Sequence, residues 1–295
     1  MKPLVSIIVN CKNGSKYLEK CLSSIKNQTF QDWEVIFFDN NSSDNSFEIF
    51  NHYKDNRFKY FRSKKNENLY KARNLACKHA NGKYIAFLDT DDWWDENYLS
   101  SKKKFLINSR YDYLYSNVLL YNEKKDKFVK YKKINFPKGL IYNSLSKDYF
   151  IIISGLIIKK KLLEKEYYFN EAYNIIGDYD LIMRISKYAN AKGFNRPLVK
   201  YRVHQNNFSK LNNRLFYEEY KNWFNKQSKL KDNSFIKNRK YFQLKLNQLE
   251  IKYLLYEKKT LNLLIKIIKI SDFFLMIKFL SAFFLPLNLI NFFRK

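Results

Sequence analysis

Three short, largely apolar runs in the first third of the chain constrain its fold more than any other feature. They cover residues 4–9, 33–38 and 84–88, and the last two end directly in acidic residues, Asp39 and Asp89. Apolar runs of this length are typical of strands that are buried on both faces of a sheet. Because helices must cover such a sheet, the runs favour an α/β protein.

Segments with helical periodicity lie between these runs. Residues 16–28, 46–54 and 68–80 each predict a helix. Alternation of strand and helix at this length predicts a doubly wound, mostly parallel sheet. Ligands bind such sheets at the carboxyl ends of the strands, so we expect a site near Asp39 and Asp89.

The charge of the chain narrows the classes of partner. The 295 residues include 55 basic and 28 acidic ones, a net charge of +27, and lysine outnumbers arginine by 45 to ten. Proteins that bind nucleic acid favour arginine, so nucleic-acid binding is the weaker alternative. An anionic membrane surface or a phosphate-bearing substrate explains the same charge. The three cysteines form no CxxC pair, which indicates a reducing compartment without a disulfide framework.

Residues 100–200 mix segments with the periodicity of strands and segments with the periodicity of helices. Residues 111–121 and 128–133 predict a hairpin, residues 179–188 a helix and residues 198–203 a strand. The chain has no GxxxxGK[ST], GxGxxG, GxSxG or HExxH motif. The alternating pattern is therefore not that of a P-loop, dinucleotide-binding or serine-hydrolase protein, and no zincin motif is present.

The acids at the two strand ends are the first candidates for chemistry. Asp89 and Asp91 follow a strand and are one residue apart, where their oxygens suit Mg²⁺ or Mn²⁺ beside a diphosphate. The alternative is a helix N-cap, because Asp92 precedes a predicted helix that begins near Trp93. Asp39 lies where a nucleoside base or ribose would bind, or it begins an Asx-turn.

Two more candidates follow residue 170. Asp178 and Asp180 flank a tyrosine at the start of a predicted helix. A positioned carboxylate suits a general base for a hydroxyl, whereas helix capping is the alternative role and is the one we expect for Asp180. His204, one of three histidines, follows a predicted strand. A structural or surface role is the alternative for it.

Taken in order, these motifs resemble those of family-2 glycosyltransferases with a GT-A fold. The resemblance covers residues 3–210 and rests on VSIIV (5–9), YL (17–18), CLSSI (21–25), NQTF (27–30), WEVI (33–36), DNNSSD (39–44), KARN (71–74), GKYIAFLDTDD (82–92), DYDL (178–181) with Arg184, and YRVH (201–204). Each motif is modest, but the ordered set is specific. The resemblance implies a Rossmann-like, mostly parallel sheet with flanking helices, and the pattern of the residues beyond it predicts a C-terminal helical extension.

The resemblance also implies roles for the donor side of the site. Asp39 would contact the nucleotide base, usually uracil, Arg73 would help to hold the nucleotide, and Asp89 would lie near the ribose. Asp91 would ligate the Mn²⁺ or Mg²⁺ that bridges the diphosphate, with His204 approaching the metal or the diphosphate.

Asp178 matches the catalytic base of the inverting members of the family. A single displacement at the anomeric carbon, with a proton passing from the acceptor hydroxyl to Asp178, would invert the configuration. Two residues depart from the family pattern. Gly177 stands where the family often has Glu, and Asn10 follows the first strand where the family often has Pro or Thr. The second departure changes what touches the base.

The composition changes near residue 210, beyond which there is no glycine. We expect a catalytic domain over residues 1–210, with a nucleotide-sugar half (1–100) and an acceptor half (101–210). Residues 211–295 form a basic, apolar region that predicts helices.

The last part of that region predicts a membrane contact. Residues 261–272 predict a basic amphipathic helix, and residues 273–293 are long enough to span a bilayer. Polar interruptions in the second segment favour a helix that lies in the interface. The alternatives are packing on the catalytic domain or an oligomer contact.

From these features we expect an inverting, metal-dependent glycosyltransferase that uses a nucleotide sugar, with UDP as the favoured nucleotide. Its acceptor would be a glycan or a lipid-linked glycan in bacterial surface polysaccharide or lipooligosaccharide synthesis. The enzyme would lie peripherally at the cytoplasmic face of the inner membrane and would bind no nucleic acid. The alternatives are a basic nucleic-acid-binding protein and an inactive scaffold with the same fold.

Overall fold

A computed structural model describes residues 2–108 and 110–257, and it divides the chain into two compact units. The first unit covers Met1–Asn207 and the second Phe208–Lys295. The helices expected over residues 261–272 and 273–293 lie outside the described residues.

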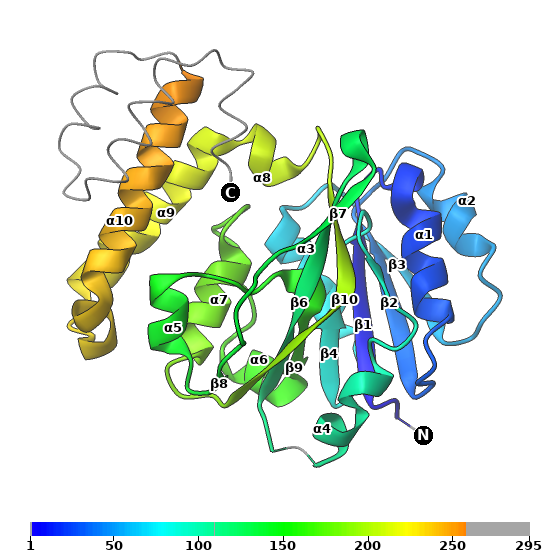
Figure 1. Ribbon diagram of the computed structural model, residues 1–295. Helices are drawn as coiled ribbons and strands as arrows, with labels where there is room; N and C mark the ends of the chain where they lie inside the picture. The colour runs from blue at the N-terminus through cyan, green and yellow to red at the C-terminus, as the bar shows by residue number, and fades with distance from the viewer. Residues whose placement is uncertain (1, 109, 258–295) are drawn as a thin grey trace. The chain divides into compact units, whose positions relative to one another are not determined.

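One mixed sheet forms the centre of the first unit (Figure 1). Its strands follow the order β3-β2-β1-β4-β9-β6-β10-β5, with β7 paired to β6 and β8 to β10. Their bounds are β1 Val5–Cys11, β2 Trp33–Asp39, β3 Phe58–Arg62, β4 Tyr84–Phe87, β5 Trp93–Trp94, β6 Tyr113–Asn122, β7 Lys127–Lys130, β8 Lys138–Gly139, β9 Leu156–Lys159 and β10 Ala191–Val203. Strands β1 to β4 are mutually parallel, and β9 runs antiparallel to β4 and β6. The predicted α/β class and the hairpin of β6 and β7 are confirmed.

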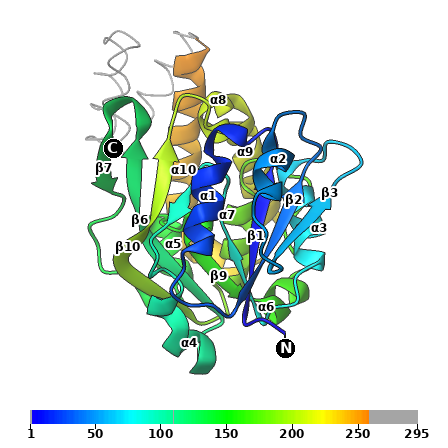
Figure 2. The same ribbon diagram turned by 90° about the vertical axis from the view of Figure 1, so that its right-hand side faces the viewer.

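Helices cover both faces of this sheet (Figures 1 and 2). The helices are α1 Ser15–Lys26, α2 Ser46–Asn51, α3 Leu69–Lys78, α4 Lys103–Asn108, α5 Tyr142–Lys147, α6 Lys160–Lys165 and α7 Gly177–Ile185, with short 3₁₀ turns η1 Ser100–Lys102, η2 Glu123–Lys125 and η3 Ile153–Gly155. In both views α1 and α3 lie on opposite sides of β1 and β2.

The side chains of β1 explain why its sequence shows no alternation. Val5, Ile7 and Val9 point to one face and join a buried cluster with α1 residues such as Leu18 and Leu22. The side chains between them point to the face that α3 covers and are also buried up to position 8. Burial of both faces therefore selects a continuous apolar run.

The second unit consists of α8 Phe208–Leu211, α9 Asn213–Lys229 and α10 Asn233–Tyr256. Helices α9 and α10 pack through aromatic side chains, with the Trp223 ring 5.4 Å from that of Phe242. Asp232 caps α10 by accepting hydrogen bonds from the backbone N–H groups of Ser234 and Phe235. Among the residues that the structure describes, no helix combines the length and the hydropathy needed to cross a bilayer.

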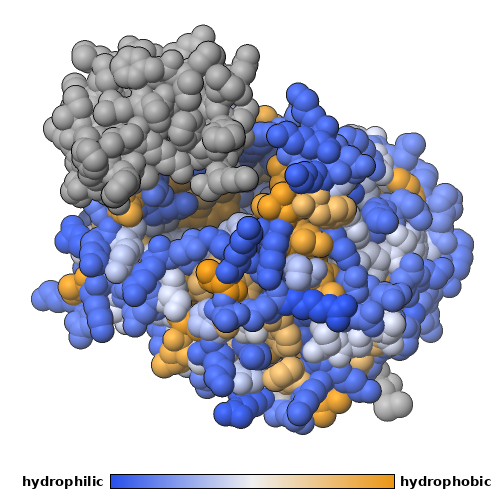
Figure 3. All heavy atoms as spheres, in the orientation of Figure 1, coloured by the Kyte–Doolittle hydropathy of each residue, from blue (hydrophilic) through white to orange (hydrophobic). Residues whose placement is uncertain are grey.

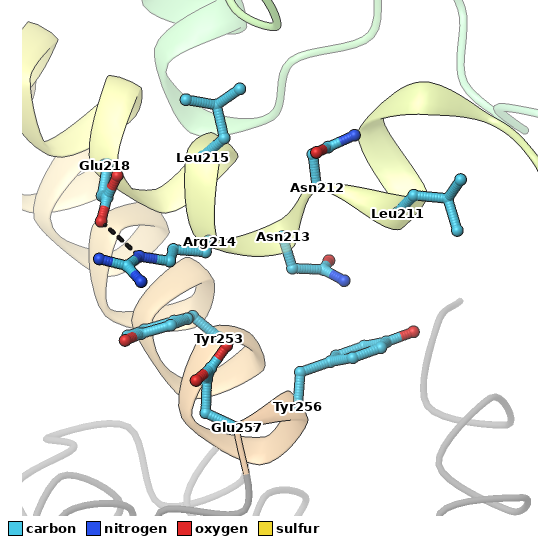
Figure 4. A pocket seen from close by; sticks show the side chains of 9 residues that line it. All are labelled: Leu211, Asn212, Asn213, Arg214, Leu215, Glu218, Tyr253, Tyr256 and Glu257. Carbon is cyan, nitrogen blue, oxygen red and sulfur yellow. Dashed lines mark hydrogen bonds and ion pairs between the residues drawn. The ribbon is translucent and has the colours of Figure 1, made fainter.

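A hollow of about 260 Å³ lies within this second unit (Figure 4). Its lining comes from α8, α9 and α10 and from Glu257, and Arg214 Nε donates to Glu218 at 2.8 Å on its wall. It contains none of the predicted site residues. The predicted chemistry therefore belongs to the first unit.

Candidate active site

The carboxyl ends of β2, β1 and β4 form one edge of the sheet, where two predicted acids lie. Cys11, the last residue of β1, pairs with Asp39, the last residue of β2. The N–H of Leu88 donates to the carbonyl of Ile8, so Asp89 emerges on the other side of β1. Asp39 and Asp89 are therefore two strands apart, which corresponds to about 10 Å at the usual strand spacing.

Asp39 is held by its own turn and by the neighbouring strand. Its buried carboxylate accepts hydrogen bonds from the N–H of Ser42 and the hydroxyl of Tyr60, both at 2.7 Å, and Arg62 Nε lies 3.7 Å away. Burial and then the bond to Asp39 raise the pKa of Tyr60, which keeps its hydroxyl protonated. Within the described part of the chain, Asp39 has no hydrogen bond or ion pair with another predicted site residue.

Arg73 of α3 lies between two of the predicted acids. Its buried guanidinium forms an ion pair with Asp89 at 2.5 Å. Burial raises the pKa of both Asp89 and Asp178 above the ordinary value, and the positive charge of Arg73 acts against that rise at both acids. Arg73 is therefore placed to keep two half-buried carboxylates ionised.

Asp178 lies in the first turn of α7, and its two oxygens have different surroundings. Oδ1 accepts a hydrogen bond from the N–H of Tyr179 at 2.9 Å and lies 2.9 Å from the hydroxyl of Tyr70. No described residue contacts Oδ2 within hydrogen-bond distance. The Tyr70 ring also explains the glycine at position 177, because a Cβ there would lie 2.5 Å from that ring.

Asp91 and His204 come together from segments far apart in the sequence. His204 follows β10, and its Nε2 lies 3.0 Å from Asp91 Oδ2. The N–H of Asn206 lies 3.2 Å from Nδ1, while Nε2 faces Asp91; which ring nitrogen donates is set by the tautomer. The Tyr17 ring packs against the imidazole at 5.1 Å.

The donor atoms of this pair suit an open cation site. A carboxylate oxygen is a ligand that Mn²⁺ and Mg²⁺ take together with substrate phosphates, and a neutral imidazole nitrogen is a common metal ligand in general. Over residues 2–108 and 110–257, no three His, Cys, Asp or Glu side chains are grouped closely enough to enclose a metal. Asp91 and His204 thus fit a cation whose coordination a diphosphate and water would complete.

The predicted helix cap at Asp92 is wrong. Trp93 and Trp94 form the short strand β5, which pairs with β10 in an antiparallel manner. Asp92 is buried and accepts hydrogen bonds from the Ser154 hydroxyl at 2.5 Å and the Arg202 N–H at 2.9 Å. It therefore ties the acidic loop to η3 and to β10 instead of capping a helix.

Arg202 holds the same loop from the end of β10. Its Nε donates to the carbonyl of Asp91 at 3.0 Å, and its guanidinium lies 4.5 Å from the Tyr17 ring and 4.7 Å from the Trp93 ring. Sequence reasoning did not assign a function to Tyr70, Ser154 or Arg202. Only Arg202 gave a signal, because it belongs to the YRVH motif.

The charges of the three loop acids and of Asp178 in α7 act on one further residue, Tyr201. Its pKa is raised by burial and then by the charges of Asp92, Asp91, Asp89 and Asp178. The structure thus brings six polar residues from distant segments into one cluster: Arg73, Asp89, Asp91, Asp92, Asp178 and His204. Asp39 lies on the same edge of the sheet, at the end of β2.

Asn10 lies between Asp39 and Asp89 in the order of strands. Both polar atoms of its amide are buried and have no hydrogen-bond partner among the described residues. An amide with two unused hydrogen-bonding groups is rare in a folded protein and indicates a partner that binds there. Asp180, by contrast, forms an ion pair with Arg184 at 3.1 Å, one turn along the same helix.

Comparison with known proteins agrees with this arrangement. Residues 6–167 match the model of the family named glycosyl transferase family 2. The chain is 31% identical over 211 residues to the Escherichia coli protein WfgD, described as a UDP-Glc:α-D-GlcNAc-diphosphoundecaprenol β-1,3-glucosyltransferase, covering 70% of this chain and 79% of WfgD. It is 29% identical to the putative teichuronic acid biosynthesis glycosyltransferase TuaG of Bacillus subtilis, covering 70% and 82%.

Solved structures show the same fold at lower sequence identity. The S. aureus protein TarS, residues 1–349 with UDP-GlcNAc, superposes with a TM-score of 0.59 at 20% identity, over 86% of this chain and 72% of TarS. The mannosyltransferase PcManGT of Pyrobaculum calidifontis, with GDP-Man and Mn²⁺, gives 0.60 at 16% identity, over 84% and 72%. The chain therefore belongs to glycosyltransferase family 2, and it is a glycosyltransferase with the GT-A fold.

Proposed function

We propose that this enzyme transfers a sugar from a UDP-sugar to a lipid-linked glycan acceptor, with inversion at the anomeric carbon, in the synthesis of a bacterial surface polysaccharide. One observation carries the proposal. Asp178 keeps a free carboxylate oxygen in the described structure and shares Arg73 with Asp89, in the cluster that also contains Asp91 and His204. A base and a group of residues suited to a diphosphate therefore face the same region.

The chemistry assigned to Asp178 follows from its surroundings. As the acceptor hydroxyl attacks the anomeric carbon, Oδ2 takes its proton, and the C–O bond to the nucleotide diphosphate breaks on the opposite face. Hydrogen bonds to Oδ1 hold the carboxylate in place during this step. Mn²⁺ or Mg²⁺ bound by Asp91 and His204 would neutralise charge on the diphosphate.

The residues of the sheet edge support a pyrimidine nucleotide as donor. Asn10 offers a buried donor and a buried acceptor, which match the alternating polar groups on the edge of uracil. Asp39 ends the neighbouring strand, one position further along, with its turn fixed by Ser42. The description of WfgD names UDP-Glc and the solved complex of TarS contains UDP-GlcNAc, and both support UDP as the nucleotide of the donor.

The acceptor and the location are proposed from the description of a relative and from the charge of the C-terminal region. The acceptor of WfgD is named as a diphosphoundecaprenol-linked sugar, which resides in a membrane. Residues 211–295 of this chain have many more basic than acidic residues, and such a region is attracted to anionic lipid. We infer peripheral attachment at the cytoplasmic face of the inner membrane. The donor half (1–100) and the acceptor half (101–210) remain parts of this proposal.

A donor panel and one variant test the proposal. UDP-, GDP- and CMP-sugars are compared by thermal stabilisation with Mn²⁺, and product from a lipid-linked acceptor is examined by NMR for its anomeric configuration. We expect Asp178→Asn to lower kcat/KM by about 10²- to 10⁴-fold while stabilisation by UDP persists. Asp180→Asn is not a suitable control because Asp180 pairs with Arg184, so Glu48→Gln, on an exposed face of α2, serves instead. A product with retained configuration would remove Asp178 from the role of base.

A further inference from the structure

One exposed feature of the first unit plays no part in the chemistry above. The end of β6 and the turn and edge strand that follow it, residues 122–130, carry four exposed lysines: Lys124, Lys125, Lys127 and Lys130. None of the four has an ion-pair partner in the described part of the chain. Between them, Phe128 and Val129 are 46% and 43% exposed. We call residues 122–130 the basic hairpin; at the place where Figure 1 labels β7, Figure 3 shows hydrophobic groups beside strongly hydrophilic ones.

The basic hairpin adjoins the active site. Asn122, at its base, pairs with Val203, the last residue of β10, and His204 follows directly. Glu123 accepts a hydrogen bond from the hydroxyl of Tyr17, whose ring packs on His204. The orientation of the hairpin is therefore fixed relative to Asp91 and His204, within the same unit.

Aromatic packing makes the apolar part of this surface rigid. The Phe128 ring lies 4.8 Å from the Tyr121 ring and 6.2 Å from the Trp93 ring. Lys20 of α1 extends over Trp93, with its Nζ 5.9 Å from the ring centroid. Phe128 is therefore held firmly on one face of the hairpin and Val129 lies on the other, with the four lysines around both.

Protection of an edge strand explains only part of this pattern. Lysines on an edge strand prevent pairing with another chain, and β7 is such a strand. The same reasoning would keep Phe128 and Val129 out of an exposed edge, because an apolar edge favours aggregation. A surface that is both apolar and strongly cationic, with unpaired charges, matches an interface between water and anionic lipid.

We propose that the basic hairpin docks on an anionic bilayer, with Phe128 and Val129 entering the headgroup region and the four lysines contacting anionic headgroups. Each lysine near such a surface strengthens binding by about fivefold. This docking rests on the proposed function only for its purpose, because it would bring the active site to a lipid-linked acceptor. Docking itself is measured without any sugar nucleotide, so it fails or stands independently of the proposed reaction.

The first test measures whether the basic hairpin itself enters the bilayer. All three native cysteines are buried, so a cysteine introduced by Val129→Cys in the full chain can be labelled selectively with an environment-sensitive fluorophore. The matched control is Lys78→Cys, an exposed position at the end of α3, which lies toward the opposite edge of the sheet. The probes are vesicles of phosphatidylcholine alone or with phosphatidylglycerol at 7:3. We expect a blue shift at position 129 only, and only with the anionic vesicles.

The second test uses charge. Lys124→Gln with Lys127→Gln is compared with Lys103→Gln plus Lys104→Gln, exposed lysines that lie near the opposite end of this unit (Figure 1). Both variants have the same net charge. We expect the hairpin variant to bind anionic vesicles about tenfold or more weakly, and the control to bind like the parent chain.

Three results would overturn the proposal. The label at position 129 could stay unshifted while the protein sediments with anionic vesicles. Both charge variants could lose the same affinity, which would indicate a response to net charge alone. Finally, RNA could shift the label where anionic vesicles do not, which would make the basic hairpin a nucleic-acid surface.

Discussion

At the scale of single residues, Asp178 shows how a departure from the family pattern is accommodated. The family often has Glu at the position of Gly177, and here the Tyr70 ring fills the space that a side chain would need. The Tyr70 hydroxyl lies 2.9 Å from Asp178 Oδ1 and 2.8 Å from the carbonyl of Ile175. Tyr70 therefore orients the carboxylate from α3 in a chain that lacks an acid beside it.

This contact predicts a shift in the pH profile of Tyr70→Phe. Burial raises the pKa of Asp178, and the hydrogen bond from Tyr70 acts to lower it. Loss of that bond therefore raises the pKa further, so the base is protonated at a higher pH. We expect the acidic limb of the kcat/KM profile to move toward higher pH, with activity on the alkaline side reduced by less than about tenfold.

Tyr149→Phe is the matched control for this measurement. The Tyr149 hydroxyl is buried and has no hydrogen-bond partner in the described structure, and burial and the charge of Asp178 raise its pKa. Its removal takes away a hydroxyl near Asp178 without breaking a hydrogen bond. An acidic limb that stays in place in Tyr70→Phe, or moves equally in both variants, would contradict the positioning role of Tyr70.

At the scale of elements, Glu34 joins the strands at the edge of the sheet opposite the active site. Its carboxylate accepts hydrogen bonds from the Ser6 hydroxyl of β1, the Lys59 ammonium of β3 and the N–H of Asn81 before β4, each at 2.6 Å. Burial alone would raise the pKa of Glu34, but these three bonds outweigh it and lower the pKa. One side chain thus stabilises the register of four parallel strands.

Glu34→Ala is expected to lower the free energy of unfolding by about 2–4 kcal/mol, because buried donors lose a charged acceptor. Glu48→Ala, on an exposed face of α2, should stay within about 0.5 kcal/mol of the parent chain. Denaturant unfolding measures both. Since the folded pKa of Glu34 is lowered, its contribution is complete above the ordinary value of 4.5 and disappears as the pH falls below it. A loss equal to that of Glu48→Ala would contradict the role given to Glu34.

Local patterns predicted most of these elements but not their pairing across the chain. Runs such as that of β1 predicted buried strands correctly because both faces of the sheet are covered. Trp93 and Trp94 were assigned to a helix, since Asp92 before them looks like a cap. They form a strand because β10, about a hundred residues later, offers Val199 and Lys200 as partners. No local signal reports such a partner.

At the scale of the whole molecule, the site combines groups that sequence reasoning found with groups that it did not. Asp91 and His204 belong to recognisable motifs, and the structure places their side chains 3.0 Å apart. Tyr70 and Ser154 lie in segments where a buried tyrosine or serine is unremarkable by itself, and Arg202 was marked only as part of the YRVH motif. Their function arises only from the positions of distant acids, which a local pattern does not encode. Residues that belong to local motifs could therefore be predicted, whereas roles that depend on which strands lie side by side could not.

The separation of the chain into two units yields a final prediction. Every predicted site residue lies within Met1–Asn207, and the backbone N–H of His204 donates to the side chain of Asn207 at 2.7 Å. A chain that ends after Leu211 keeps this bond and the complete cluster. We expect it to fold and to gain the same stabilisation from UDP with Mn²⁺ as the full chain, about 2.7 kcal/mol at a ligand concentration of 100 Kd. Thermal unfolding measures this, and the same shortened chain with Asp91→Asn, which should lose the Mn²⁺-dependent part, is the control. A shortened chain that folds but shows no response to UDP would mean that residues beyond Leu211 complete the donor site.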